Sequence, residues 1–87
     1  MNFLHSEYPN LGPENVIEVT LDAQANVTLL DDSNFCRYRN GQSFEYRGGL
    51  AKRSPVFMSP PYHGHWHLVV DLGGYSGNVN VGTRLVR

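Results

Sequence analysis

The sequence contains one cysteine, Cys36, so no disulfide can form within the chain. A small domain of 87 residues that is stable without disulfides is typical of a reducing compartment. No apolar run approaches the roughly 20 residues that a membrane-spanning helix requires. The first residues, MNFLHSEYPN, lack the basic segment followed by an apolar run that marks a signal peptide. We therefore expect a cytoplasmic protein with no membrane partner.

Charge is also scarce, because 17% of the residues are charged and the formal net charge is −1. A chain without a basic excess has no general electrostatic attraction for nucleic acid or for an anionic membrane, so we expect neither as a partner. The sequence has no internal repeat, and 87 residues leave no room for a second hydrophobic core. These features predict a single domain spanning residues 1–87.

The arrangements typical of nucleophilic enzymes are missing as well. Cys36 has no activating neighbour along the sequence, and no serine lies in a strand–serine–helix elbow. The carboxylate pair Asp31-Asp32 lacks the spaced ligands and the distal glutamate of a calcium loop, which favours a turn at this point. We therefore expect a protein that is not an enzyme and that carries no cofactor.

What the sequence does contain is apolar and polar residues alternating at period two, the pattern of a β-strand. Residues 15–21 place Ile17, Val19 and Leu21 on one face, with Glu18 and Thr20 on the other. Further strands are predicted at residues 27–31, 55–59, 64–72 and 78–86. We expect an all-β fold of about six to eight short strands, forming a small antiparallel β-sandwich or a partly open barrel.

Glycine-containing turns predict two hairpins. Asn40-Gly41 suits a type I′ turn, which would pair the segments on either side of it, although residues 33–39 could also hold a helical turn. That ribbon would place arginines beside aromatic rings on one face, as in a packed sheet or a base-stacking surface: Phe35, Arg37, Arg39, Phe44 and Tyr46. Residues 73–77 predict a hairpin between the last two strands.

Three of the four histidines occupy alternate positions around the only tryptophan, in the stretch HGHWHLVVDL. In a strand, Trp66 faces the core while His65, His67 and Asp71 share the opposite face. Two histidines on one strand face can converge on a metal ion, with a third ligand supplied by His63, Asp71, His5 or Glu45. The interpretation that we favour is a hydrogen-bonded polar face, at which a partner could bind.

The segment RGGLAKRSP, residues 47–55, carries the only local basic cluster. If it forms a loop, its backbone N–H groups and cationic side chains could hold a phosphate or a carboxylate. We expect ligand or partner contacts at Arg47, Lys52 and Arg53. A second set of expected contacts comprises His65, His67 and Tyr75.

Three stretches together resemble a small bacterial family, domain of unknown function 1883: residues 1–41, YRGGLAKRSPV and GHWHLVVDLGGYSG. The resemblance covers essentially the whole chain and implies an all-β domain that occurs alone or fused ahead of a TIR domain. It also implies a sensing or interaction role in bacterial defence or signalling. The family brings no established activity or catalytic residue.

Three functional hypotheses follow. The leading one is a non-enzymatic recognition module that binds a small anionic ligand or a protein partner. The second is a metal-dependent, cupin-like enzyme that uses His63, His65 and His67. The third is a module that forms homodimers through a flat sheet and short edge strands.

Overall fold

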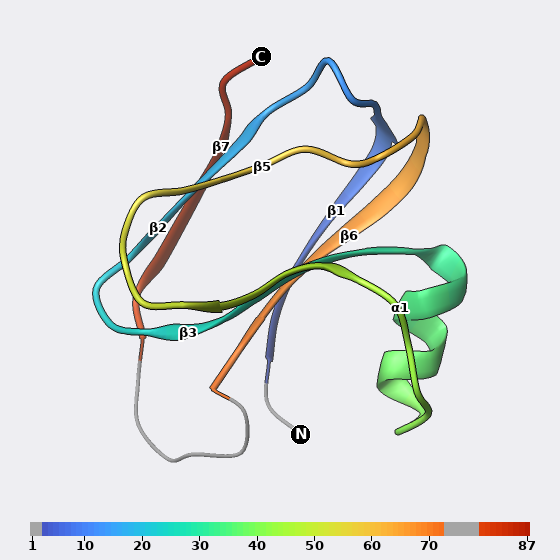
Figure 1. Ribbon diagram of the computed structural model, residues 1–87, viewed down its shortest axis with the longest axis horizontal. Coiled ribbons are helices and arrows are strands. Elements are labelled where there is room, and N and C mark those ends of the chain that lie inside the picture. The colour runs from blue at the N-terminus through green and yellow to red at the C-terminus, as the bar shows by residue number, and fades with distance from the viewer. Residues whose placement is uncertain (1–2, 73–78) are drawn as a thin grey trace.

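The computed structural model describes residues 3–72 and 79–87, and its strands form two antiparallel sheets (Figure 1). The first sheet has the order β1-β6-β3-β4 and the second the order β5-β2-β7. The strands are β1 (Phe3–Leu11), β2 (Ile17–Leu21), β3 (Ala25–Asp31), β4 (Arg47–Ala51), β5 (Val56–Met58), β6 (Gly64–Asp71) and β7 (Val81–Leu85). One short helix, α1 (Asp32–Arg39), follows β3. The predicted β-sandwich is confirmed, and the sheets do not close into a barrel.

The main core lies between the two sheets. Ile17 and Val19 of β2 pack with Leu29 of β3 and Leu68 of β6, and all four side chains are buried. The outward residues Glu18 and Thr20 of β2 are more exposed, which confirms the alternation predicted for this strand. Each fully buried aliphatic side chain contributes about 1.5–3 kcal/mol relative to an exposed one. The period-two pattern therefore accounts for the contact between the sheets.

A second, smaller core lies on the other face of β3 and β6, where α1 packs. Leu30 of β3 and Val69 of β6 contact Phe35 and Tyr38 of the helix. The two central strands are thus buried on both faces, by the second sheet on one side and by α1 on the other. The polar face predicted for residues 64–72 is consequently covered in part by the helix.

The hairpin predicted around Asn40-Gly41 is wrong, because its first half is α1. Asp31 caps the helix by accepting a hydrogen bond from the Asn34 N–H at 2.9 Å. At the other end Gly41 adopts φ +72°, and the N–H groups of Gly41 and Gln42 donate to the carbonyls of Tyr38 and Arg37. This is the Schellman motif, in which a glycine with positive φ ends a helix. The same Asn-Gly pair that suits a hairpin turn therefore serves as a helix stop.

Two strands differ from the sequence-based expectation. β1 was not predicted, because Pro9 interrupts its alternation, but Pro9 lies where the register with β6 shifts between Tyr8 and Leu11. Such a shift at a sheet edge tolerates proline. Residues 47–51, expected as a basic loop, form β4 and pair with β3.

The second predicted hairpin, at residues 73–77, falls largely outside the described residues. The strands that it was expected to pair, β6 and β7, lie in different sheets. That pairing is therefore wrong, although both strands exist as predicted. The single helix in the described part of the chain is too short to cross a membrane.

Asp31 gives a first testable prediction. Burial alone would raise the pKa of Asp31, but hydrogen bonds from Tyr62 and Asn34 outweigh it and hold the pKa below its usual value. Asp31→Ala removes the helix cap and should lower the free energy of unfolding by about 1–2 kcal/mol near neutral pH, measured by urea denaturation. A depressed carboxyl pKa stabilises the fold above the unfolded-state pKa of about 3.9, and this contribution is lost as the pH falls through the folded-state value. The difference between the two proteins should therefore shrink below about pH 4.

Ser33→Ala is the matched control, because Ser33 is an exposed residue of the same helical turn. It should change the unfolding free energy by less than about 0.5 kcal/mol at any pH. An Asp31→Ala deficit that persists in acid would contradict the assignment of the deficit to the charged carboxylate.

Candidate functional site

Five ligand-type side chains gather where β1, β6 and the start of α1 meet, and we call this group the histidine site. β1 supplies His5 and Glu7, β6 supplies His65 and His67, and α1 supplies Asp32. β1 and β6 are antiparallel neighbours, with Glu7 directly opposite His67. Alternate residues of paired strands share one face, so the His-x-Glu and His-x-His segments are brought together by sheet pairing. Asp32 reaches the same face because the chain turns into the helix directly after β3.

His67 is the centre of the histidine site. Its side chain is only 8% exposed, and its two ring nitrogens have different partners. Nδ1 lies 2.8 Å from Nε2 of His5, and Nε2 lies 2.5 Å from Oδ1 of Asp32. A carboxylate can only accept, so the His67 ring donates from Nε2 to Asp32, and in its neutral form it would accept at Nδ1 from His5. The ring is thereby held at both ends.

His65 lies beside His67, with ring centroids 4.9 Å apart and planes 12° from parallel. Its Nδ1 lies 3.9 Å from the same Asp32 Oδ1 that His67 contacts. Its Nε2 lies 2.8 Å from Oε2 of Glu7. The Glu7 oxygen is close enough to form a hydrogen bond but is not aligned with the ring N–H, so this shielded nitrogen makes no hydrogen bond to any described residue. The histidine site therefore contains an imidazole whose hydrogen-bonding capacity is not used.

Phe35 covers the histidine site from the helix side. Its ring stacks on His67 at a centroid distance of 4.2 Å and on His5 at 4.3 Å. Burial, and then the neighbouring charge of His67, lower the pKa of His5 below its ordinary value. A lowered pKa keeps the imidazole neutral near pH 7, and neutral imidazole is the form that binds metals.

Two groups of three side chains in the histidine site place ligand atoms within 4.8 Å of one another: Asp32 with His65 and His67, and His5 with Glu7 and His67. The first group is the better metal site, because each of its histidines has its remaining nitrogen beside an outer partner. His67 has His5 and His65 has Glu7, both at 2.8 Å. Outer partners of this kind orient metal-binding imidazoles. In the metal-bound form His67 would carry its proton on Nδ1 and donate to His5, the reverse of the metal-free arrangement, and Glu7 would have to align with the His65 Nε2–H to accept from it. Two histidines and one carboxylate form a facial ligand set with open positions.

The spacing of these ligand atoms is close to what an ion needs. Three donors at about 2.0–2.2 Å from one tetrahedral ion lie roughly 3.3 Å apart. The Asp32 oxygen is 2.5 Å from His67 and 3.9 Å from His65, values that straddle this spacing. The Asp32 side chain is 65% exposed and can adjust, whereas His67 is held in place. A small movement of the Asp32 carboxylate would therefore even out these two distances.

The structure unites some of the predicted metal ligands and separates others. His65 and His67 come together as predicted, and His5 joins them, but Asp32 and Glu7 were not predicted. His63 instead pairs with Glu14 at 2.8 Å. Asp71 accepts hydrogen bonds from Asn26 and Tyr38, and Glu45 lies in a different region, beside Asn34. One signal was present, since His5 and Glu7 alternate in the same way as His65 and His67.

The predicted basic contacts do not converge. Arg47 begins β4, whereas Lys52 and Arg53 follow its end. A five-residue strand separates these positions by about 16 Å or more. Lys52 and Arg53 line a shallow hollow beside Gly48 and Gly49. Tyr75 lies outside the described residues.

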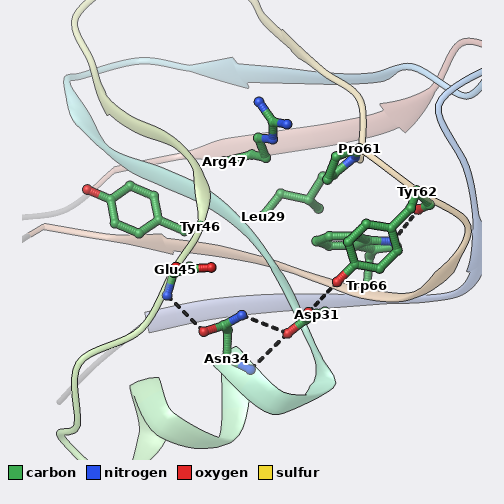
Figure 2. Close-up of a pocket in the computed structure, with 9 residues that line it drawn as sticks. All are labelled: Leu29, Asp31, Asn34, Glu45, Tyr46, Arg47, Pro61, Tyr62 and Trp66. Atoms are coloured by element: carbon green, nitrogen blue, oxygen red, sulfur yellow. Dashed lines mark hydrogen bonds between the residues drawn. The ribbon is translucent and has the colours of Figure 1, made fainter.

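Arg47 instead lines a cleft of about 200 Å³, which we call the Arg47 cleft (Figure 2). Its lining residues are Leu29, Asp31, Asn34, Glu45, Tyr46, Arg47, Pro61, Tyr62 and Trp66. Figure 2 shows Glu45, Tyr46 and Arg47 on one side, facing Tyr62 and Trp66 across Leu29. The cleft lies near the histidine site in sequence, because Asp31 lines the cleft and Asp32 belongs to the site.

Comparison with known proteins gives one result. Residues 1–87 match a family described as "Domain of unknown function (DUF1883)". No curated protein and no solved structure matches the chain. The predicted association with TIR domains stays a prediction.

Proposed function

Because the chain belongs to the DUF1883 family, whose description states no function, we propose its function from the geometry of the histidine site. The protein is a recognition module that binds a divalent transition-metal ion through Asp32, His65 and His67 and uses that ion to hold a small anionic ligand. One observation carries this proposal: two histidine nitrogens lie near one carboxylate oxygen, while the opposite nitrogen of each ring faces His5 or Glu7.

The ligand types favour a transition metal. Imidazole suits zinc, copper, iron and nickel, whereas calcium and magnesium prefer sites made entirely of oxygen atoms. Three protein ligands leave at least one coordination position open, in contrast to the four protein ligands of a structural zinc site. The open position would be available to a molecule from outside the protein.

The surroundings favour an anion in that position. A divalent ion with one carboxylate and two neutral imidazoles has a net charge of +1. A cavity of about 620 Å³ adjoins the histidine site, and its lining includes the charged side chains of Arg39 and Glu7 together with His5, Asp32 and His67. A small carboxylate or phosphate bound there would have both the ion and a guanidinium as partners. A protein partner, self-association and a role in bacterial defence or signalling stay predictions.

The enzymatic alternative needs a different set of ligands from the one first considered. His63 pairs with Glu14, and Asp32 is the third ligand in place of His63. An ion with an open position could activate water, so a hydrolytic metal centre is the second candidate function. Hydrolysis that requires the metal and is lost in Asp32→Asn would favour this second candidate.

The proposal is tested by measuring metal content in protein prepared without a histidine tag. After exposure to Zn²⁺, Ni²⁺ or Co²⁺ and removal of the excess, we expect one ion per chain by elemental analysis. The Co²⁺ form should show the visible absorption of a four- or five-coordinate site. Affinity should fall as the pH drops below about 6.5, because protons compete for the imidazoles.

His65→Ala should abolish stoichiometric binding, and His63→Ala is the matched control. The two histidines are two residues apart on the same segment, and the control residue lies outside the histidine site. Equal losses in both variants would indicate nonspecific binding to surface histidines and would overturn the proposal. Absence of bound metal in the wild-type protein would overturn it as well.

A further inference from the structure

The Arg47 cleft is a separate feature that the metal proposal does not use. We propose that it binds a small zwitterion with an apolar body, of the chemical class of an α-amino acid with a hydrophobic side chain.

Most polar groups in the Arg47 cleft are used by the protein itself. Asp31 accepts hydrogen bonds at one oxygen from the N–H and the side-chain amide of Asn34, and at the other from the Tyr62 hydroxyl. The Asn34 amide oxygen accepts from the Glu45 N–H at 2.8 Å. The Trp66 indole donates to the Tyr62 carbonyl at 3.0 Å. Figure 2 shows these bonds as a chain that joins the walls of the cleft.

This series of hydrogen bonds fixes the walls of the cleft and leaves few polar groups free to contact a ligand. The hydrogen bond to Asp31 raises the pKa of Tyr62, so the hydroxyl stays protonated and remains committed to Asp31. A sugar would need many hydrogen-bonding groups, and few remain. Its hydroxyl groups would be buried without partners, which disfavours a carbohydrate ligand.

Two opposite charges remain unused. The guanidinium of Arg47 and the carboxylate of Glu45 make no hydrogen bond or ion pair with any described residue. Glu45 lies two residues before Arg47, the first residue of β4, so their Cα atoms lie within about 7 Å of each other. Both line the cleft on the same side (Figure 2). A ligand with one carboxylate and one ammonium could therefore pair with both.

The charge balance favours a ligand that carries both charges. Asp31 and Glu45 together outweigh Arg47, so a lone anion would be repelled by two carboxylates. A lone cation would pair with Glu45 but leave the exposed Arg47 guanidinium to water, and so would use only one of the two free charges. Only a molecule with both charges satisfies both groups, and charge-assisted hydrogen bonds are the strong ones.

The body of the ligand follows from the cleft floor. Leu29 and Trp66 are buried beneath it, so the apolar surface open to a ligand comes mainly from the half-exposed rings of Tyr46 and Tyr62. A volume of about 200 Å³ is below the roughly 300 Å³ of typical drug-sized pockets, which limits the body to one side chain. A hydrophobic α-amino acid combines this size with the two charges.

The probe is L-phenylalanine, titrated into isotope-labelled protein and followed by amide chemical shifts. Phenethylamine lacks the carboxylate and 3-phenylpropanoate lacks the ammonium, so they isolate the two charges. We expect saturable shifts confined to the cleft, with L-phenylalanine binding about tenfold more tightly than either analogue. Arg47→Gln should remove the preference over phenethylamine, and Glu45→Gln should remove the preference over 3-phenylpropanoate.

Arg53→Gln is the matched control, because Arg53 is an exposed arginine beyond the other end of β4. It should leave L-phenylalanine binding unchanged. Absence of saturable shifts in the cleft, equal affinity for the three probes, or an equal loss in the control would overturn the proposal. The metal site can succeed or fail independently, because its test measures bound metal.

Discussion

His67→Leu is expected to eliminate metal binding while leaving the domain folded. The substitution removes one of three ligands, so affinity for Zn²⁺ should fall by more than about 100-fold, beyond the effect of losing an outer partner. Stability of the metal-free protein should change by less than about 1.5 kcal/mol. The reason is that leucine fills the buried position, while the former partners, Asp32 and His5, are exposed and can bond to water. Calorimetric titration and urea denaturation measure the two effects.

This combination separates a chemical role for His67 from a structural one. If the buried histidine were retained for stability, its loss would cost several kcal/mol through the unpaired groups left behind. A strongly destabilised His67→Leu protein would therefore contradict our interpretation. His63→Leu serves as the comparison and should retain both metal binding and stability.

Gly48→Ala should strongly destabilise the sandwich. Gly48 has φ +105°, and a Cβ built there would lie 2.2 Å from the Val27 carbonyl oxygen and 2.7 Å from the end of the Met58 side chain. The backbone of the paired strand cannot move away without breaking the β3–β4 pairing. Overpacking and backbone strain together should cost about 3–5 kcal/mol. A chain of this length has a total stability of about 4–13 kcal/mol, so the loss should clearly lower the urea midpoint.

Gly49→Ala is the control for this effect. Gly49 also has a positive φ, +142°, but a Cβ there would meet no atom within 4 Å. It should therefore incur only the backbone strain, about 1–3 kcal/mol. Equal losses in the two variants, measured by urea denaturation, would show that the close contact with Val27 is not what requires glycine at residue 48.

Much of the fold could be predicted because the strands of this protein alternate. Ile17 and Val19 on β2, and Trp66 and Leu68 on β6, follow the period-two pattern and are buried as expected. The helix could not be separated from a strand in the same way. Phe35 and Tyr38 are three residues apart, a helical spacing, but the following Asn-Gly pair also suits a hairpin. Asp31 as a cap and Gly41 as a stop were the signals that distinguish the two.

The histidine site was predicted only in part. His65 and His67 were identified because they are close in the sequence and share a strand face. Asp32 and Glu7 were missed because these two residues lie on other elements, 33 and 58 residues from His65 in the chain. Glu7 lies beside the histidines because β1 pairs with β6, and Asp32 lies there because the chain turns from β3 into α1. For the same reason Arg47 could not be separated from Lys52 and Arg53 until β4 was placed between them.

By itself the sequence determined the all-β class, the core face of each alternating strand, and the polar face that carries His65 and His67. These are local consequences of residue order. Only the tertiary structure decided what the polar face of residues 64–72 packs against. It meets the helix α1 and the strand β1, and not open solvent. The physical reason is that Phe35 and Tyr38 must bury their rings, and the outer face of β3 and β6 is where they do so. Burying those rings brings Asp32 next to His67 and turns a polar strand face into a candidate metal site.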